Sequence, residues 1–137
     1  MTVWTQPALP QAGLYIVALR SREPVSTRRG ERRIEHRCIE VDRARCKLGK
    51  AGNLGRRARD YARVFGDANI CFTPLAVLAD DLVRAERQVL ERLRPWRVRG
   101  PGGRLNVWLW GIETDEVARI ALAALAEDGI AFTPCMP

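Results

Sequence analysis

Segment 45–65 changes its hydrophobic period at a cluster of glycines, and this change constrains the fold more than any other feature of the chain. A short β-rich run, residues 45–48, ends at Gly49. Asn53 follows, and its side chain is suited to cap a helix because it can accept a hydrogen bond from an unpaired backbone N–H group. Apolar residues then recur at spacings of four, three and four: Leu54, Ala58, Tyr61 and Phe65. The segment therefore predicts a strand, a glycine-bearing turn and a helix that runs to about Phe65.

The rest of the chain alternates short strands with two further helices. Strands are predicted at Leu14–Leu19, Ile34–Val41, Asn69–Leu78 and Leu105–Trp110. Pro74 predicts that its strand lies at an edge or carries a bulge, because proline cannot donate to a sheet ladder. Two helices are expected, one from a cap at Asp80 or Asp81 to near Leu93 and one from a cap at Thr114 through Ala126. Together these elements predict an α/β (α+β) fold, with a small, mainly antiparallel sheet flanked by helices.

The composition is that of a globular domain with a basic surface. The 137 residues are 47% hydrophobic and 28% charged, which suits one folded unit. We expect an N-terminal leader over residues 1–12, a main domain over 13–110 and a C-terminal helical extension over 111–137. The net charge of +7 favours a polyanionic partner, because lysine and arginine contacts to phosphates release condensed counterions. A solvated basic surface is the alternative.

Several classes of site and location are disfavoured. The four cysteines form no CxxC pair and the chain has one histidine, so a structural zinc site is not expected. A disulfide between Cys38 and Cys46 across a hairpin stays open. The N-terminus lacks the pattern of a signal peptide, and the longest apolar stretch, Leu75–Ala79, is too short to cross a bilayer. We therefore expect a soluble cytoplasmic protein that does not bind membranes.

The start of the helix after Asn53 has the chemistry of a phosphate site. Free backbone N–H groups and the positive end of the helix dipole favour an anion there. Arg57 lies three residues after Leu54 and four before Tyr61, so it sits beside the apolar stripe. A guanidinium held at the edge of a core can present a fixed fork to phosphate oxygens. The alternative is an arginine whose stem simply covers that stripe.

Two short motifs in this chain resemble those of a nuclease family. Gly13-Leu14-Tyr15 and Lys47-Leu48-Gly49 resemble the two motifs of the GIY-YIG nuclease superfamily. The following residues, 50–57, are similar to the stretch after the second motif in the nuclease domain of the bacterial excision-repair incision subunit. A lysine at the start of the second motif resembles the phage-T5-type subgroup. The resemblance covers about residues 13–110 and implies an endonuclease that hydrolyses phosphodiester bonds, with DNA favoured over RNA.

The resemblance implies a site with a single metal-binding glutamate on a later helix. Glu86 is the candidate, and its spacing from Leu82 and Val89 independently places it on an apolar stripe, where a carboxylate is costly unless it is paired or bound to a metal. An ion pair with a core-edge arginine is the alternative. One Mg²⁺ or Mn²⁺ ion would bind Glu86, waters and a phosphate oxygen. Arg57 would stabilise transition-state charge, and Tyr15 would activate or position water, unless Tyr15 is only a packed wedge.

The chain departs from the family at the second motif and between the motifs. Lys47 replaces a tyrosine, and we expect its charge to favour the ionised form of Tyr15. The linker is long and basic, with Arg28, Arg29 and Arg33 as candidate contacts to nucleic acid or as part of a solvated loop. His36 is expected to be structural or at the surface, with assistance to proton transfer as the alternative. The other candidate substrate-binding residues are Lys50, Asn53, Arg56 and Asn106.

The last expectations concern the tryptophans of the final strand and the alternative functions of the fold. Trp108 and Trp110 share one face of the last strand, where the final helix could cover them or bases could stack. The rival functions on the same fold are a catalytically inactive nucleic-acid-binding module and a regulatory domain that binds an acidic protein.

Overall fold

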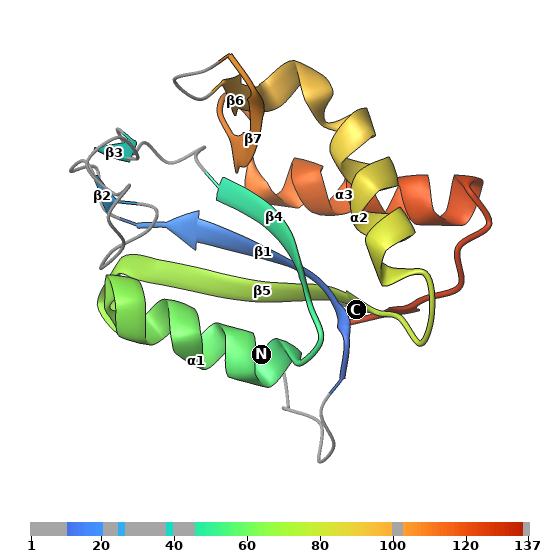
Figure 1. Ribbon diagram of the computed structural model, residues 1–137, viewed down its shortest axis with the longest axis horizontal. Helices are drawn as coiled ribbons and strands as arrows, with labels where there is room; N and C mark the ends of the chain where they lie inside the picture. The colour runs from blue at the N-terminus through green and yellow to red at the C-terminus, as the bar shows by residue number, and fades with distance from the viewer. Residues whose placement is uncertain (1–10, 21–24, 27–37, 40–45, 100–102, 136–137) are drawn as a thin grey trace.

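The computed structural model describes residues 11–20, 25–26, 38–39, 46–99 and 103–135. Most of the strands form a six-stranded antiparallel sheet with the order β6-β7-β4-β1-β5-β8 (Figure 1), and β2 (Val25–Ser26) and β3 (Cys38–Ile39) pair in a separate two-stranded sheet. The strands of the larger sheet are β1 (Gly13–Leu19), β4 (Cys46–Ala51), β5 (Ile70–Val77), β6 (Arg97–Arg99), β7 (Leu105–Leu109) and β8 (Thr133–Pro134). The helices are α1 (Leu54–Phe65), α2 (Leu82–Arg92) and α3 (Thr114–Glu127). The predicted fold class, including the C-terminal helix, is confirmed.

Strand β1 lies inside the sheet and divides the apolar residues into two cores. Leu14 and Ile16 belong to the core covered by α2 and α3, whereas Tyr15 and Val17 belong to the core covered by α1. Figure 1 shows α1 on one side of the sheet and the other two helices opposite it. A strand at Leu14–Leu19 is predicted to point successive side chains to opposite faces, and this alternation is confirmed. It places consecutive side chains of β1 in environments built by different helices.

The prediction that the strand of the second motif ends at Gly49 is wrong. Strand β4 continues to Ala51 and pairs with β1 along its length, so that Gly49 lies opposite Tyr15. A Cβ atom on Gly49 would lie 2.4 Å from the Tyr15 hydroxyl oxygen. Glycine is therefore needed here because the tyrosine ring lies directly against the strand, and not because the chain turns.

One edge of β4 is paired with β7 at only two of the strand's six residues, within the described part of the chain. Within the described residues, β7 pairs with β4 only through Cys46 and Lys47. From Leu48 to Ala51 no strand of the described chain pairs with that edge, although β1 is paired on the other side. Side chains from both faces of the sheet can therefore meet at this edge.

Helix α1 agrees with its prediction at both ends. Asn53 has an extended backbone conformation and its side chain accepts a hydrogen bond from the backbone N–H of Arg56. This is the expected capping geometry. Leu54, Tyr61 and Phe65 are buried, while Ala58 is half-buried. The apolar stripe of α1 therefore faces the sheet, and Arg57 lies at its margin.

The other helices begin differently from their predictions. Asp81 stands at the start of α2, but it has a left-handed conformation (φ 61°) and its side chain makes no capping hydrogen bond. The cap position of α3 is Glu113 rather than Thr114, again without a side-chain hydrogen bond. Core burial of Val89, Leu93 and the small residues of α3 holds these helices instead.

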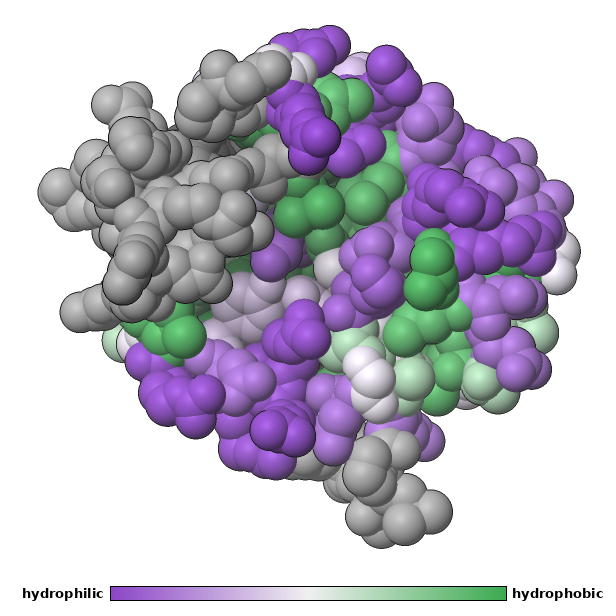
Figure 2. All heavy atoms as spheres, in the orientation of Figure 1, coloured by the Kyte–Doolittle hydropathy of each residue, from purple (hydrophilic) through white to green (hydrophobic). Residues whose placement is uncertain are grey.

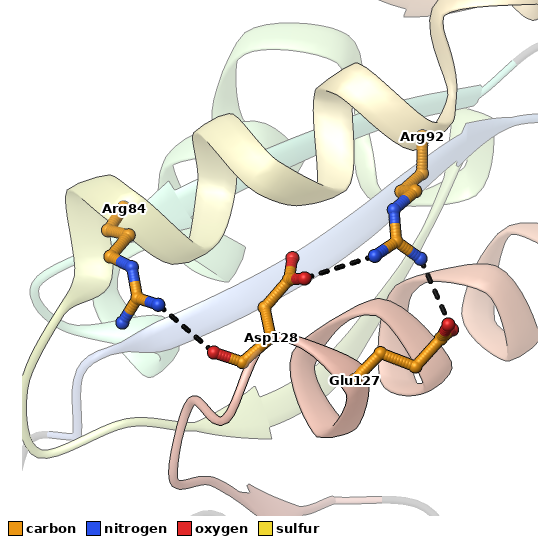
Figure 3. Close-up of polar contacts among 4 residues, drawn as sticks. All are labelled: Arg84, Arg92, Glu127 and Asp128. Carbon is orange, nitrogen blue, oxygen red and sulfur yellow. Dashed lines mark hydrogen bonds and ion pairs between the residues drawn. The ribbon is translucent and has the colours of Figure 1, made fainter.

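A cluster of ion pairs joins α2 to the end of α3. Arg92 contacts Glu127 and Asp128 at 3.2 and 3.1 Å, and Arg84 donates to the backbone carbonyl of Asp128 at 3.0 Å (Figure 3). Glu86 lies two residues after Arg84, about 200° around the helix axis. The arginines therefore fasten one side of α2 to α3, and Glu86 extends from another side.

Three further predictions, for Pro74, for the segment before β7 and for the two tryptophans, can be compared with the structure. Opposite Pro74 the register between β1 and β5 shifts, which confirms the predicted bulge. Strand β6 is not among the strands that the sequence predicts, and it pairs with β7. Trp108 joins the core beside α1, and Trp110 is 48% exposed, so the prediction that the final helix covers both is wrong.

Two sequence expectations concern thiols and membranes. Cys46 is buried with a free thiol, so it forms no disulfide with Cys38. Burial, with a contribution from Glu113, raises the pKa of the Cys46 thiol to about 12, which removes it as a nucleophile near neutral pH. In the described part of the chain, no helix has the length and apolar character required to span a membrane.

Candidate functional site

A pocket of about 440 Å³ lies at the open edge of β4. It receives side chains from β1, β4, α1 and α2, and therefore from both faces of the sheet. Its charged and hydroxyl-bearing lining residues are Tyr15, Lys47, Lys50, Arg57 and Glu86. The structure thus brings together all four predicted catalytic residues and one predicted substrate-binding residue. Figure 2 shows hydrophilic residues over α1 and along α2 on this view of the molecule.

Arg57 is held in a fixed position by two acceptors. One guanidinium nitrogen donates to the Tyr15 hydroxyl and to the backbone carbonyl of Lys50, each at 3.2 Å. Burial disfavours the charged form, but the hydrogen bond and charge of Tyr15 together with the charges of Tyr61 and Asp60 raise the pKa of Arg57 above its ordinary value. Arg57 is therefore a permanent cation at the pocket, oriented by the strand edge and by the phenol.

Tyr61 is a site residue that the sequence reasoning placed only in the core. Its hydroxyl lies 3.0 Å from that of Tyr15 and accepts a hydrogen bond from Lys47. Burial, followed by the charge and hydrogen bond of Tyr15, raises the pKa of Tyr61 far above that of an ordinary tyrosine. The spacing of four between Arg57 and Tyr61 was the available signal, since it puts both on one side of α1. Tyr61 therefore stays a neutral phenol behind Tyr15.

The direction of each hydrogen bond around the two tyrosines follows from which side chains can only donate. Lysine and arginine side chains donate but do not accept, so the oxygens of Tyr61 and Tyr15 accept from Lys47 and Arg57 respectively. The buried Tyr61 proton then has the Tyr15 oxygen as its acceptor at 3.0 Å. We assign that direction by satisfying the network. Tyr15 consequently accepts two hydrogen bonds and can direct its own proton toward the pocket.

Glu86 forms an ion pair with Lys50 across the pocket. The distance from Lys50 Nζ to Glu86 Oε1 is 3.0 Å, and the two side chains are 38% and 19% exposed. The predicted alternative for Glu86, an ion pair with a core-edge arginine such as Arg57, thus has a lysine of β4 in place of the arginine. Glu91 lies elsewhere on α2, is well exposed and pairs with Arg94 at 3.6 Å. Within α2, Glu86 is the carboxylate that reaches the pocket.

Replacing Gly49 should disturb the site through Tyr15. In Gly49→Ala the new Cβ meets the tyrosine hydroxyl, so the ring must move or the strands must separate. We expect a loss of about 1 to 3 kcal/mol in the free energy of unfolding, as for other overpacked cores. Denaturant unfolding measures this loss.

Gly52→Ala is the matched control for that substitution. A Cβ at Gly52 meets nothing within 4 Å, so its unfolding free energy should stay close to that of the parent. Equal stability of the two variants would contradict the close contact between Gly49 and Tyr15.

Of the remaining candidate residues, the two whose side chains the structure describes, Asn53 and Arg56, lie outside the pocket lining. The side-chain oxygen of Asn53 is engaged in capping α1, and Arg56 is exposed outside the pocket lining. The side chain of Asn106 lies outside the described part of the structure. The same holds for the linker residues Arg28, Arg29, Arg33 and His36.

Comparison with known proteins adds no relative. No family model, curated protein or solved structure matches this chain. The chemical interpretation of the pocket therefore rests on its residues and their geometry.

Proposed function

We propose that this chain is a metal-dependent endonuclease that hydrolyses phosphodiester bonds in nucleic acid, with DNA as the favoured substrate. The observation that carries this proposal is the convergence of Tyr15, Arg57 and Glu86 at one pocket, from β1, α1 and α2. A phenol, a fixed guanidinium and a single carboxylate are the groups that the motif resemblance requires. They come from segments far apart in the chain.

The pocket has the charge balance of a phosphate site. Three cationic side chains, Lys47, Lys50 and Arg57, line it with one carboxylate. Arg57 can donate to a phosphate oxygen with little loss of side-chain freedom, because the strand edge already orients it. In the transition state, where negative charge on the phosphate oxygens increases, such a preorganised donor is most effective. Arg57 therefore serves as the phosphate-binding residue.

In this proposal Tyr15 activates or positions the water that attacks the phosphate. Its oxygen receives hydrogen bonds from Arg57 and Tyr61, so its own proton and remaining lone pair can face the pocket. An ionised Tyr15 can accept a proton from water, and a neutral one can orient it. Lys47 contributes through Tyr61, to which it donates.

The residues present fit a magnesium or manganese ion. Mg²⁺ usually binds through one or two carboxylates, retained waters and substrate phosphates. Glu86 offers a carboxylate, on a side chain that is 19% exposed, at a pocket with room for waters. When bound, the ion would supply positive charge for the phosphate oxygens. In the part of the chain that the structure describes, histidine, cysteine, aspartate and glutamate side chains form no group of three or more that could hold a metal ion.

Incubation with plasmid DNA, single-stranded DNA and RNA, each with and without Mg²⁺ or Mn²⁺, tests the proposal. We expect nicking or cleavage of DNA that requires the metal and stops with a chelator. Binding that falls steeply with salt, without cleavage of any substrate, would instead support the inactive nucleic-acid-binding module. Lack of both binding and cleavage would leave the regulatory, protein-binding alternative.

A further inference from the structure

Lys50 occupies the position that a cation at Glu86 would need. Its ammonium nitrogen lies 3.0 Å from a Glu86 oxygen, and the two residues come from β4 and α2. Glu86 is the one carboxylate among the residues that line the pocket. An ion bound to this carboxylate therefore meets a resident positive charge at close range.

This resident charge weakens the binding of a divalent ion to the free protein. A dication at Glu86 is repelled by the ammonium group, and its binding also requires the ion pair to loosen. With Lys50 38% exposed, solvent screens this repulsion but does not remove it. We expect the screened repulsion between the ammonium group and the dication to weaken metal binding by about tenfold.

A phosphate group removes the conflict. Lysine carries a compact charge on a flexible stem, so its ammonium can swing from a carboxylate to a phosphate oxygen. The phosphate also offers oxygen ligands to the metal. Both effects strengthen metal binding when phosphate is present. Since coupling between two ligands is reciprocal, the metal must strengthen phosphate binding by the same factor.

We infer that Lys50 is exchanged between Glu86 and a backbone phosphate, so that the metal and the nucleic acid bind this pocket cooperatively. The inference rests on the proposed function, because it assigns the metal to Glu86 and the phosphate to the same pocket. Lys50 competes with the metal for Glu86 in the free protein and is a phosphate ligand in the complex. The free protein then carries little metal until its substrate arrives.

Mn²⁺ binding to the full chain, measured by electron paramagnetic resonance of the free ion, tests the inference without any cleavage. Lys50→Met should bind Mn²⁺ about tenfold more tightly than the parent. Lys50→Arg, which keeps the charge, should bind it like the parent. Arg63→Met is the matched control: it also removes one positive charge, but Arg63 is exposed on α1 and pairs with Asp60. It should leave Mn²⁺ affinity unchanged.

The second arm measures the coupling itself. The affinity for a labelled DNA duplex is compared in chelator and in Ca²⁺, a hard oxygen-binding ion used here in place of Mg²⁺. The parent should bind DNA more tightly with Ca²⁺, and the ratio should shrink in Lys50→Met, because its metal site no longer needs the phosphate to draw the lysine away. Circular dichroism and thermal melting verify that each variant is folded.

The outcomes separate this inference from the proposed function. Equal Mn²⁺ affinity in the parent and Lys50→Met, or an equal gain in Arg63→Met, overturns the inference even if the protein cleaves DNA. A tenfold gain specific to Lys50→Met supports it even if the protein cleaves nothing. A folded Lys50→Met that binds no Mn²⁺ overturns the metal assignment and the inference together.

Discussion

Glu86→Ala is expected to abolish metal-dependent cleavage while the protein stays folded. The substitution removes the carboxylate that lines the pocket, and with it the anchor for the divalent ion. Because a bound metal contributes several kcal/mol of transition-state stabilisation, we expect the single-turnover rate to fall by at least about 10³-fold. Glu86 is only partly buried and its partner Lys50 is 38% exposed, so the loss should cost little stability.

Glu91→Ala is the control for this prediction. Glu91 lies on the same helix, is exposed and pairs only at the surface with Arg94. Its removal takes away the same charge from α2 without touching the pocket, so the cleavage rate should be close to that of the parent. Parental activity in Glu86→Ala would rule out its role as the metal ligand.

Tyr15→Phe should have the second large effect, a loss of at least about 10²-fold in the cleavage rate at saturating substrate. The hydroxyl that it removes accepts from Arg57 and contacts Tyr61, and it is the phenol of the network that lines the pocket. The ring stacks on Phe72 and should keep its place in the core. Substrate affinity should therefore change far less than the rate.

Lys47 and Tyr61 should act on that rate as one unit. Because Lys47 donates to Tyr61, and Tyr61 contacts Tyr15, Lys47→Met should move the alkaline rise of the rate to higher pH. In a Tyr61→Phe background the same lysine substitution should add little, which a double-mutant cycle measures. Full additivity of the two substitutions would contradict action through Tyr61, and a parental pH profile in Lys47→Met would make Lys47 a scaffold or phosphate contact.

The tyrosine network can also be followed without substrate. Tyr15 and Tyr61 are the two tyrosines of the chain, so the ultraviolet absorbance of tyrosinate in Tyr15→Phe reports Tyr61 alone. Burial is the largest cause of the raised Tyr61 pKa and persists in this variant. Tyr61 should therefore ionise well above pH of about 10, the value for a free tyrosine. Ionisation near that value in the folded variant would show that Tyr61 is more solvated than the structure indicates.

Local patterns in the chain were enough to locate its main elements. The alternation of Leu14 to Leu19 predicted which side chains of β1 face each layer, because successive residues of a strand point to opposite sides. The stripe after Asn53 predicted α1 and its cap, and it put Arg57 at the margin of the buried face. Glu86 stood out because a carboxylate on an apolar stripe needs a partner. Each of these features depends on residues within one or two turns or strands of each other.

The assembly of the pocket depended on relations that no local spacing contains. Gly49 looked like a turn residue, and the register of β4 against β1 showed that it makes room for Tyr15. Tyr61 looked like a core residue because its spacing on α1 predicts burial. That spacing does not reveal the hydrogen bond between its hydroxyl and that of Tyr15. Lys50 and Glu86 meet because Lys50 lies opposite Leu14, on the face of the sheet that α2 covers. Tyr15 and Arg57 reach the same pocket from the other face, at the edge of β4 that β7 leaves unpaired. Strand order, register and the extent of pairing arise from the packing of the whole chain, and it is these that place the phenol, the guanidinium and the carboxylate together.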